Sequence, residues 1–400
     1  MSLLKILFFL EGNWLSHVSR PLCIARELRS RGHQITFACS GRFTYLIETE
    51  GFEIYPIFTK DPDMGLSKAR LAGTAYDNHI VMKYIKDEIE CIKKLNPDIV
   101  ICDFRLTVKT SSEFCRKPYV SIINGYWTNY YSAVHTAPDS LRLVKFLGKR
   151  VSCRFYPFIK HFLLKKAVRP FNRSRRILGL PPCFNIFDAM ESDLLNLVPD
   201  LPDYAPLKDF PDSFTFIGPI LWEPEIPTPE WLAKVNREQP VLYFTIGSTG
   251  FNSLFDVALS EYAQTDTQVI MSIGDTAITR KIPPNFYVEP YVPGLRVLDV
   301  SDVVICHGGN GTIYQAFSKG VPVVGIPTMH DQWFNMERVE TLGAGTKVTG
   351  LEKNPKILIN AINKILKNQR FAANARYLKT SILKYNAPKT AACCIERCLE

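Results

Sequence analysis

The sequence predicts an α/β protein built from two doubly wound, parallel-sheet domains that face each other across a cleft. Three observations lead to this fold class. Short apolar runs of the β type alternate with segments of helical periodicity in both halves of the chain. A proline-rich segment at 217–231 separates the two halves. The length of 400 residues and the hydrophobic content of 46% suit two cores of about 150–200 residues each.

The first half begins with a strand and continues in strand–helix order. Helices are predicted over 18–32, 43–50 and 79–95, and a short one follows residue 103. Pro21 falls near the first turn of the first helix and Gly32 follows its end, which is where these two residues are favoured. Because parallel strands need helical crossovers, this order indicates one parallel sheet. Its predicted strands are 5–10, 34–39, 53–58, 98–103 and 118–123.

The second half repeats this pattern after the proline-rich segment. Its predicted strands are 240–247, 268–274, 285–292, 302–307 and 321–327. Proline removes hydrogen-bond donors and fixes the backbone, so the segment between the halves is interpreted as a semi-rigid linker. The domains that we infer are a first domain at 1–217, a linker at 218–239, a second domain at 240–380, and a helical tail at 381–400 that packs back on the first domain.

The composition excludes several other classes of protein. The N-terminal apolar run from Ile6 ends at Glu11, too short to span a membrane and without a cleavage site, so we expect no signal peptide and a cytoplasmic protein. The eleven cysteines never form a Cys-x-x-Cys pair, which favours reduced thiols and no metal site. The Asp-x-Asp at 61–63 is interpreted as a solvated turn rather than a pair of metal ligands.

Much of the net charge of +9 comes from one segment. Between Ser140 and Phe187 there are twelve Lys and Arg residues and no Asp or Glu. Because the excess is local, general nucleic-acid binding explains it poorly, and we expect no nucleic-acid partner. Residues 142–176 mix these cations with aromatic side chains. Three interpretations fit them: a solvated helical face, peripheral contact with an anionic membrane, or selection of an acidic acceptor.

A glycine-rich motif, HGGNGT at 307–312, joins the strand at 302–307 to a helical segment. Glycine lets the backbone approach a ligand closely, and the helix from Thr312 would direct free N–H groups and its positive end toward an anion. The motif is neither a Walker loop nor a dinucleotide fingerprint. It predicts a phosphate-binding loop, and the alternative is a tight strand–helix turn. The residues predicted to bind are His307, Gly309, Asn310, Gly311 and Thr312.

Polar side chains also follow two neighbouring strands of the second domain. Asp331 and Gln332 come after the strand at 321–327, and Ser248 and Thr249 come after the strand at 240–247. Right-handed crossovers bring the carboxyl ends of parallel strands to one edge of a sheet, where such folds bind ligands. A carboxylate beside an amide suits a polyhydroxylated sugar, which offers donors and acceptors. The second domain is therefore predicted to bind a sugar phosphate.

The first domain supplies a candidate base. His17 lies between the first strand and the first helix, at the ligand-binding edge, where the helix N-terminus disfavours a protonated ring. Asp103 ends the strand at 98–103 and opens onto the same edge. It could accept the other ring N–H, fix the tautomer and stabilise the imidazolium. The alternatives from spacing alone are a solvated loop residue for His17 and a helix cap for Asp103.

Residues 304–345 (VICHGGNGTIYQAFSKGVPVVGIPTMHDQWFNMERVETLGAG) resemble the donor-sugar signature of the UDP-glycosyltransferase superfamily, most closely that of bacterial macrolide-type natural-product glycosyltransferases. The resemblance implies two Rossmann-like domains, the glycosyltransferase B fold. It implies that the 307–312 loop binds the diphosphate and that Asp331 and Gln332 hold the sugar hydroxyls. Tyr291 and Val292 fall where the family places the nucleobase, and His17 and Asp103 match its catalytic pair.

The sequence departs from the family pattern at three positions. Gln315 stands where many members have a glutamate that binds the ribose hydroxyls, so the donor could be a UDP-sugar or a dTDP-sugar. Ser16 stands where a glycine usually precedes the catalytic histidine. Pro21 is also displaced from the position that the family pattern gives it.

The function that we expect is an inverting, metal-independent glycosyltransferase with no cofactor besides its nucleotide-sugar co-substrate. The acceptor would be a hydroxyl of an apolar small molecule or lipid, bound by the first domain. The aromatic stretch NGYWTNYY at 124–131 could line its pocket or simply pack. Two alternatives are a B-fold nucleotide-sugar epimerase or hydrolase and a non-catalytic nucleotide-sugar-binding subunit of a membrane glycosyltransferase.

Overall fold

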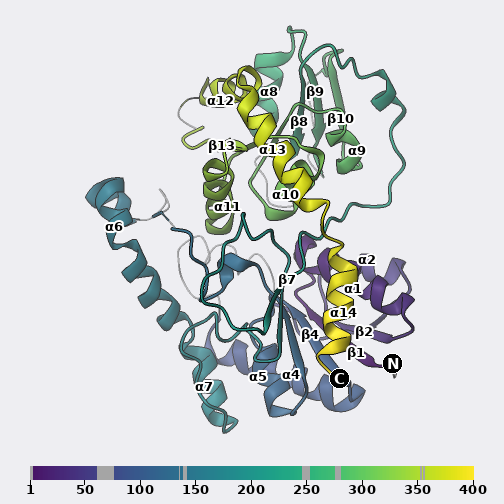
Figure 1. The fold of residues 1–400 in the computed structure, drawn as a ribbon, viewed down its shortest axis with the longest axis vertical. Helices are drawn as coiled ribbons and strands as arrows, with labels where there is room; N and C mark the ends of the chain where they lie inside the picture. Colours follow the sequence, from purple (N-terminus) through teal and green to yellow (C-terminus); the bar gives the residue numbers. More distant parts are fainter. Residues whose placement is uncertain are drawn as a thin grey trace. The chain divides into compact units, whose positions relative to one another are not determined.

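The computed structural model describes residues 3–60, 76–134, 136–137, 142–245, 253–274, 281–351, 354 and 356–400. The chain divides into two compact units (Figure 1). Unit 1 comprises Met1–Ile220 and Tyr385–Glu400, and unit 2 comprises Leu221–Lys384. The division falls within the proline-rich segment, and the last helix of the chain belongs to unit 1.

Unit 1 contains a parallel seven-stranded sheet in the order β3-β2-β1-β4-β5-β6-β7. Its strands are β1 (Lys5–Leu10), β2 (Gln34–Ala38), β3 (Glu53–Tyr55), β4 (Ile99–Asp103), β5 (Tyr119–Ile122), β6 (Leu195–Val198) and β7 (Phe214–Phe216). Its α-helices are α1 (Leu15–Ser30), α2 (Tyr45–Thr49), α4 (Asn78–Leu95), α5 (Val108–Phe114), α6 (Arg142–Ala167), α7 (Arg169–Ile177) and α14 (Ala387–Arg397). All five residues of β4 are buried, because helices cover both faces of a parallel sheet.

Unit 2 contains a parallel six-stranded sheet in the order β10-β9-β8-β11-β12-β13. Its strands are β8 (Val241–Thr245), β9 (Gln268–Ser272), β10 (Phe286–Glu289), β11 (Val303–Cys306), β12 (Val323–Gly325) and β13 (Gly345–Lys347). Its α-helices are α8 (Ser253–Tyr262), α9 (Gly294–Leu298), α10 (Asn310–Lys319), α11 (His330–Thr341), α12 (Lys356–Lys367) and α13 (Gln369–Ile382). One core cluster of this unit lies between the sheet and helices α8 and α12.

Each sheet reverses its strand order at one central pair of strands. In unit 1 this pair is β1 and β4, with Leu10 opposite Asp103. In unit 2 it is β8 and β11, with Thr245 opposite Cys306. The carboxyl ends of such a pair form the crevice where doubly wound sheets bind ligands. The predicted fold class, two doubly wound parallel-sheet domains, is confirmed.

Several elements differ from their predicted bounds. Helix α1 begins at Leu15, so Pro21 lies inside the helix and not near its first turn. Strand β3 ends at Tyr55 because Pro56 has no N–H to continue the ladder. Strands β6, β7 and β13 were not predicted, since each has only three or four residues and β6 contains a buried Asn196.

The C-terminal helix α14 packs against α1 within unit 1. Arg31 Nη1 donates to Glu396 Oε2 at 2.7 Å, and His33 Nε2 lies 3.0 Å from the other carboxylate oxygen of Glu396. His33 is buried, and its Nδ1 accepts a hydrogen bond from the backbone N–H of Leu4. These contacts give His33 a structural role in holding the tail.

Candidate active site

The candidate catalytic pair lies at the carboxyl edge of the unit 1 sheet. Asp103 is the last residue of β4, and His17 is in the first turn of α1, the helix that follows β1. His17 Nδ1 and Asp103 Oδ1 are 2.8 Å apart. The structure therefore brings together the two residues that the sequence placed at the ends of neighbouring strands.

The chemistry of the pair fixes the tautomer of the histidine. A carboxylate can only accept hydrogen bonds, so His17 Nδ1–H donates to Asp103 and the lone pair lies on Nε2. The Asp103 side chain is fully buried, whereas the His17 side chain is 17% exposed. A ring held in this way can take a proton at Nε2, and the buried carboxylate then stabilises the imidazolium.

Arg20 is a member of this cluster that the sequence analysis missed. It lies one turn after His17 on α1, and its Nη2 donates to Asp103 Oδ1 at 2.7 Å. The same Nη2 is 3.2 Å from His17 Nδ1, so both groups direct a donor at one carboxylate oxygen. Arg20 Nη1 donates to Asn124 Oδ1 at 2.7 Å, and Asn124 Nδ2 donates to Asp200. The i, i+3 spacing of His17 and Arg20 was the available signal.

Phe104 fixes the plane of the His17 ring. The two rings are stacked, with centroids 4.8 Å apart and planes 6° from parallel. Phe104 has a φ of +59°, which a residue with a side chain adopts at a cost in free energy. Because Phe104 directly follows Asp103, this backbone conformation turns its phenyl ring onto the imidazole of His17. The ring of Trp127 packs on Phe104 in turn, at 5.3 Å.

The aromatic stretch 124–131 continues from this stack into the core. Tyr126 is buried, and Trp127 and Tyr130 are half-buried and pack against Phe187 and Phe214 respectively. Much of the stretch is thus packed, and Trp127 reaches the His17 ring through Phe104. A packed aromatic wall beside the candidate base is suited to an apolar acceptor.

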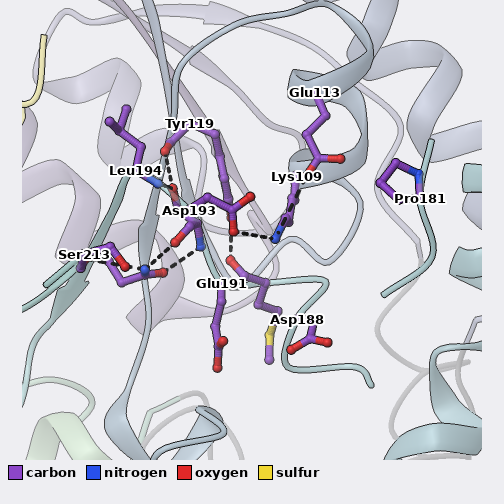
Figure 2. Close-up of polar contacts among 12 residues, drawn as sticks. Lys109, Glu113, Tyr119, Pro181, Asp188, Glu191, Asp193, Leu194 and Ser213 are labelled. Carbon is purple, nitrogen blue, oxygen red and sulfur yellow. Dashed lines mark hydrogen bonds and ion pairs between the residues drawn. The ribbon is translucent and has the colours of Figure 1, made fainter. Parts of the chain in front are cut away.

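An acidic turn at 188–193 holds this stretch in place. Asn129 donates from its backbone N–H to Glu191 Oε1 at 2.9 Å and from Nδ2 to Asp188 Oδ1 at 2.7 Å. Figure 2 shows Lys109 of α5 directed at Asp193 of the same turn, with an Nζ–Oδ1 distance of 3.5 Å. Burial raises the pKa of Glu191 to about 7, against the opposing effect of the Asn129 hydrogen bonds.

The predicted phosphate loop lies at the corresponding edge of the unit 2 sheet. His307 follows β11, and Gly309 is the N-cap of α10 without a side-chain hydrogen bond to the first turn. The backbone N–H groups of Asn310, Gly311 and Thr312 thus begin a ten-residue helix, whose N-terminus favours an anion. The sequence predicted the helix from Thr312, and it begins two residues earlier.

Two glycines give this loop its shape. Gly308 has a φ of +86°, a conformation that favours glycine. A Cβ on Gly309 would lie 2.5 Å from His307 Nε2, so the imidazole lies directly over the Gly309 backbone. A Cβ on Gly311 would meet nothing within 4 Å. His307 and the start of α10 are therefore held close together.

Helix α11 packs next to the loop and carries Asp331 and Gln332 in its first turn. Asn335 Nδ2 donates to Gly308 O at 3.1 Å, which joins the helix to the loop. Gln332 is buried, and its Oε1 accepts hydrogen bonds from Thr328 N, Thr328 Oγ1 and Met329 N at 2.9–3.1 Å. Gln332 thus has a structural role as a helix cap, and any contact with a sugar hydroxyl would be through Nε2.

Gln315 contacts the segment that precedes β8. Its Nε2 donates to the backbone carbonyl of Trp222 at 2.6 Å. A glutamate has no donor for this bond and would direct a carboxylate at a carbonyl oxygen. The departure from the family pattern therefore has a local reason. Nearby, Val292 is buried and Tyr291 is 55% exposed, both just after β10.

Two groups of residues that the sequence analysis singled out fall outside the described part of the chain. Ser248 and Thr249, and the Asp-x-Asp at 61–63, lie outside the described residues. Within the described ranges, no group of three or more His, Cys, Asp or Glu side chains is arranged to hold a metal ion. The described helices include none that is long and apolar enough to cross a membrane.

Comparison with known proteins decides the family. A model described as the erythromycin biosynthesis protein CIII-like C-terminal domain matches residues 256–397. A PGL/p-HBAD biosynthesis glycosyltransferase of Mycobacterium tuberculosis is 30% identical over 375 residues, which cover 94% of this chain and 87% of the relative. The chain belongs to the B-fold glycosyltransferases. This glycosyltransferase moves a glycosyl group from a nucleotide sugar to an acceptor.

Solved structures share the fold of this glycosyltransferase. The glycotransferase of kitacinnamycin superposes with a TM-score of 0.76 at 21% identity over 100% of both chains. SsfS6 of Streptomyces sp. SF2575, complexed with thymidine diphosphate, superposes with a TM-score of 0.73 at 18% identity, covering 98% of this chain and 99% of SsfS6. The predicted resemblance to natural-product glycosyltransferases is confirmed.

Proposed function

We propose that the protein transfers a sugar from a UDP- or dTDP-sugar to a hydroxyl of an apolar small molecule or lipid, with inversion at the anomeric carbon and without a metal ion or further cofactor. The observation that carries this proposal is the 2.8 Å contact of His17 Nδ1 with the fully buried Asp103. A binding subunit has no need of such a base.

In the proposed reaction His17 Nε2 takes the proton of the acceptor hydroxyl. The hydroxyl oxygen forms a bond to the anomeric carbon as the bond from that carbon to the diphosphate oxygen breaks, and the electron pair leaves with the diphosphate. Attack from the side opposite the leaving group inverts the configuration. Asp103 stabilises the imidazolium, while the α10 N-terminus and His307 stabilise the developing negative charge.

The proposed donor site lies in unit 2. The loop residues His307, Gly309, Asn310, Gly311 and Thr312 would bind the diphosphate, and Asp331 and Gln332 the sugar hydroxyls. Tyr291 and Val292 would contact the nucleobase, Gln315 the pentose, and Ser248 and Thr249 would add hydroxyls. The thymidine diphosphate in the SsfS6 complex supports a dTDP-sugar as one donor class.

We assign the acceptor-binding site, and the surface that would present a membrane-bound acceptor, to unit 1. The packed aromatic wall at Phe104 and Trp127, beside His17, supports an apolar acceptor. The segment 142–176 carries cations without any acid, which supports peripheral contact with an anionic membrane over a merely solvated face.

A substitution at His17 tests the proposal. With His17→Ala, product formation should fall to near background, whereas the thermal stabilisation by the nucleoside diphosphate should be unchanged. A nucleotide-sugar epimerase or hydrolase would instead yield products from the nucleotide sugar alone, so analysis of reactions without acceptor separates these activities from transfer. Near-normal transfer by His17→Ala would remove this residue from the mechanism.

A panel of nucleotides tests the donor class. At about one hundred times its dissociation constant, a ligand adds roughly 2.7 kcal/mol to the free energy of unfolding. We expect UDP or dTDP to raise the melting temperature and GDP and ADP to leave it unchanged. No response to any of the four would contradict the phosphate-loop assignment.

A further inference from the structure

Helix α6 carries an apolar stripe on its outer face. The helix is interrupted at Gly148, which has a φ of +74°. In the turns that follow, Val151, Phe155, Phe158 and Phe162 are spaced by four, three and four residues, which places them on one side of a helix. Their exposed fractions are 44%, 50%, 76% and 61%. Four large apolar side chains in succession are therefore in contact with water.

The opposite face of α6 packs on the rest of unit 1. Ser152 and Tyr156 are buried, and Leu164 packs on the core cluster that includes Phe171 and Phe187. The helix thus has one face that its own domain covers, and the apolar stripe lies on the other face. In Figure 1, none of the unit 1 helices that the structure describes lies along the outer side of α6. The exposed stripe is not part of the core.

Cations flank the stripe on both sides. Arg154, Lys165 and Lys166 are exposed, and helical geometry places them next to the phenylalanines. Lys165 Nζ lies 4.2 Å from the ring centroid of Phe184, a further aromatic side chain that is 61% exposed. In the described part of the chain, Arg154 and Lys166 form no ion pair. The surface combines phenyl rings with unneutralised positive charge.

We propose that this face of α6 docks on an anionic lipid bilayer and inserts its stripe of one valine and three phenylalanines at the interface. Aromatic rings favour the boundary between head groups and acyl chains, while Lys and Arg extend to the phosphates. The stripe from Val151 to Phe162 runs along the helix axis for about 17 Å at 1.5 Å per residue. All four side chains can reach the interface together only if the helix lies in the membrane plane. Docking does not depend on the transfer reaction.

A second copy of the chain fits this face less well. A two-fold interface through α6 would oppose the same patch on both subunits, and the patch has no acid between Ser140 and Phe187. Arg154 and Lys166 would then meet like charges from the other copy, which is unfavourable. Charge complementarity therefore favours anionic lipid.

Vesicle binding by the full chain tests the proposal. Co-sedimentation is measured at about 150 mM salt with neutral phosphatidylcholine vesicles and with vesicles containing about one third phosphatidylglycerol. The wild type should bind the anionic vesicles only. Phe155→Ser/Phe158→Ser/Phe162→Ser should lower the partition coefficient by about tenfold or more. Arg154→Glu/Lys166→Glu should lower it by at least about fivefold for each cation removed.

Controls separate docking from misfolding and from self-association. Tyr377→Ser/Leu383→Ser removes two side chains of unit 2 that are 62% and 71% exposed, and it should bind as the wild type does. Phe158→Trp keeps the apolar surface, and its added emission should shift to the blue with anionic vesicles. The proposal would be overturned if the wild type pelleted equally with neutral vesicles or did not pellet at all. It would also be overturned if the triple variant bound as the wild type does, or if the wild type were a dimer and the triple variant a monomer.

Discussion

Replacement of Asp103 by asparagine is the most informative single change in the candidate active site. The two side chains have nearly the same shape, so the change removes charge rather than volume. In the wild type Asp103 Oδ1 accepts from His17 at 2.8 Å and from Arg20 at 2.7 Å. Asparagine can still accept a hydrogen bond, but it offers no negative charge to either partner.

The expected loss of turnover follows from the charge on the imidazolium. Two unit charges separated by roughly 4 Å interact by about 4 kcal/mol at an effective dielectric constant of about 20. At about 1.4 kcal/mol per tenfold change in rate, Asp103→Asn should lower turnover about a thousandfold. The variant also leaves the guanidinium of Arg20 without its charged partner. Breaking a buried ion pair costs about 3–5 kcal/mol, and the 12% exposure of Arg20 and its bond to Asn124 reduce this to roughly 2–4 kcal/mol.

The assay follows transfer of labelled sugar to a hydroxyl acceptor at saturating donor, alongside urea unfolding. The matched control is Asp98→Asn, which removes the same charge just before the other end of β4, where Asp98 Oδ2 accepts from the N–H of Lys5. The control should keep turnover within about twofold. Turnover of Asp103→Asn within about tenfold of the wild type would refute stabilisation of the imidazolium by Asp103.

Three further changes test other parts of the molecule. Arg20→Met leaves Asp103 buried without its cation and should lower the free energy of unfolding by about 3–5 kcal/mol in urea titrations; a loss below about 1 kcal/mol would contradict the pairing. Glu191→Gln tests a carboxyl whose pKa rises from 4.5 to about 7 through burial. Ionisation of Glu191 destabilises the folded wild type as pH rises through this window. The free energy of unfolding of the variant should therefore rise relative to that of the wild type by up to about 3 kcal/mol between about pH 5 and pH 8. The same difference between variant and wild type at both pH values would refute the raised pKa. Gly309→Ala places a Cβ 2.5 Å from His307 Nε2, so nucleoside diphosphate affinity by calorimetry should fall at least about tenfold, and unchanged affinity would count against the loop.

Long apolar runs made most of the sheet predictable. Strands β1 and β4 read as buried strands because nearly every residue is apolar, and both are buried throughout their central residues. Strand β6 was missed because Asn196 interrupts it. Its side chain is fully buried and bonds to the Ser192 backbone in both directions, which no periodicity rule reveals.

The candidate site was predictable where strand ends determine it. His17 and Asp103 were placed at one edge because parallel strands share a carboxyl edge, and they meet there. Arg20 was missed because a cation on an amphipathic helix is usually a surface residue. The same limit applies to Arg105, which is fully buried and pairs with the buried Glu88 at 2.6 Å. Charge burial depends on partners distant in sequence, and a single sequence does not name them.

The measurement that tests the central claim most directly is sugar transfer by His17→Ala, made together with nucleoside diphosphate binding by the same preparation. The claim is that His17 takes the proton of the acceptor hydroxyl while a separate loop holds the donor. We expect transfer to fall by about a thousandfold or more, with nucleotide affinity equal to that of the wild type. Transfer close to the wild-type rate, or loss of transfer and nucleotide binding together, would contradict the claim.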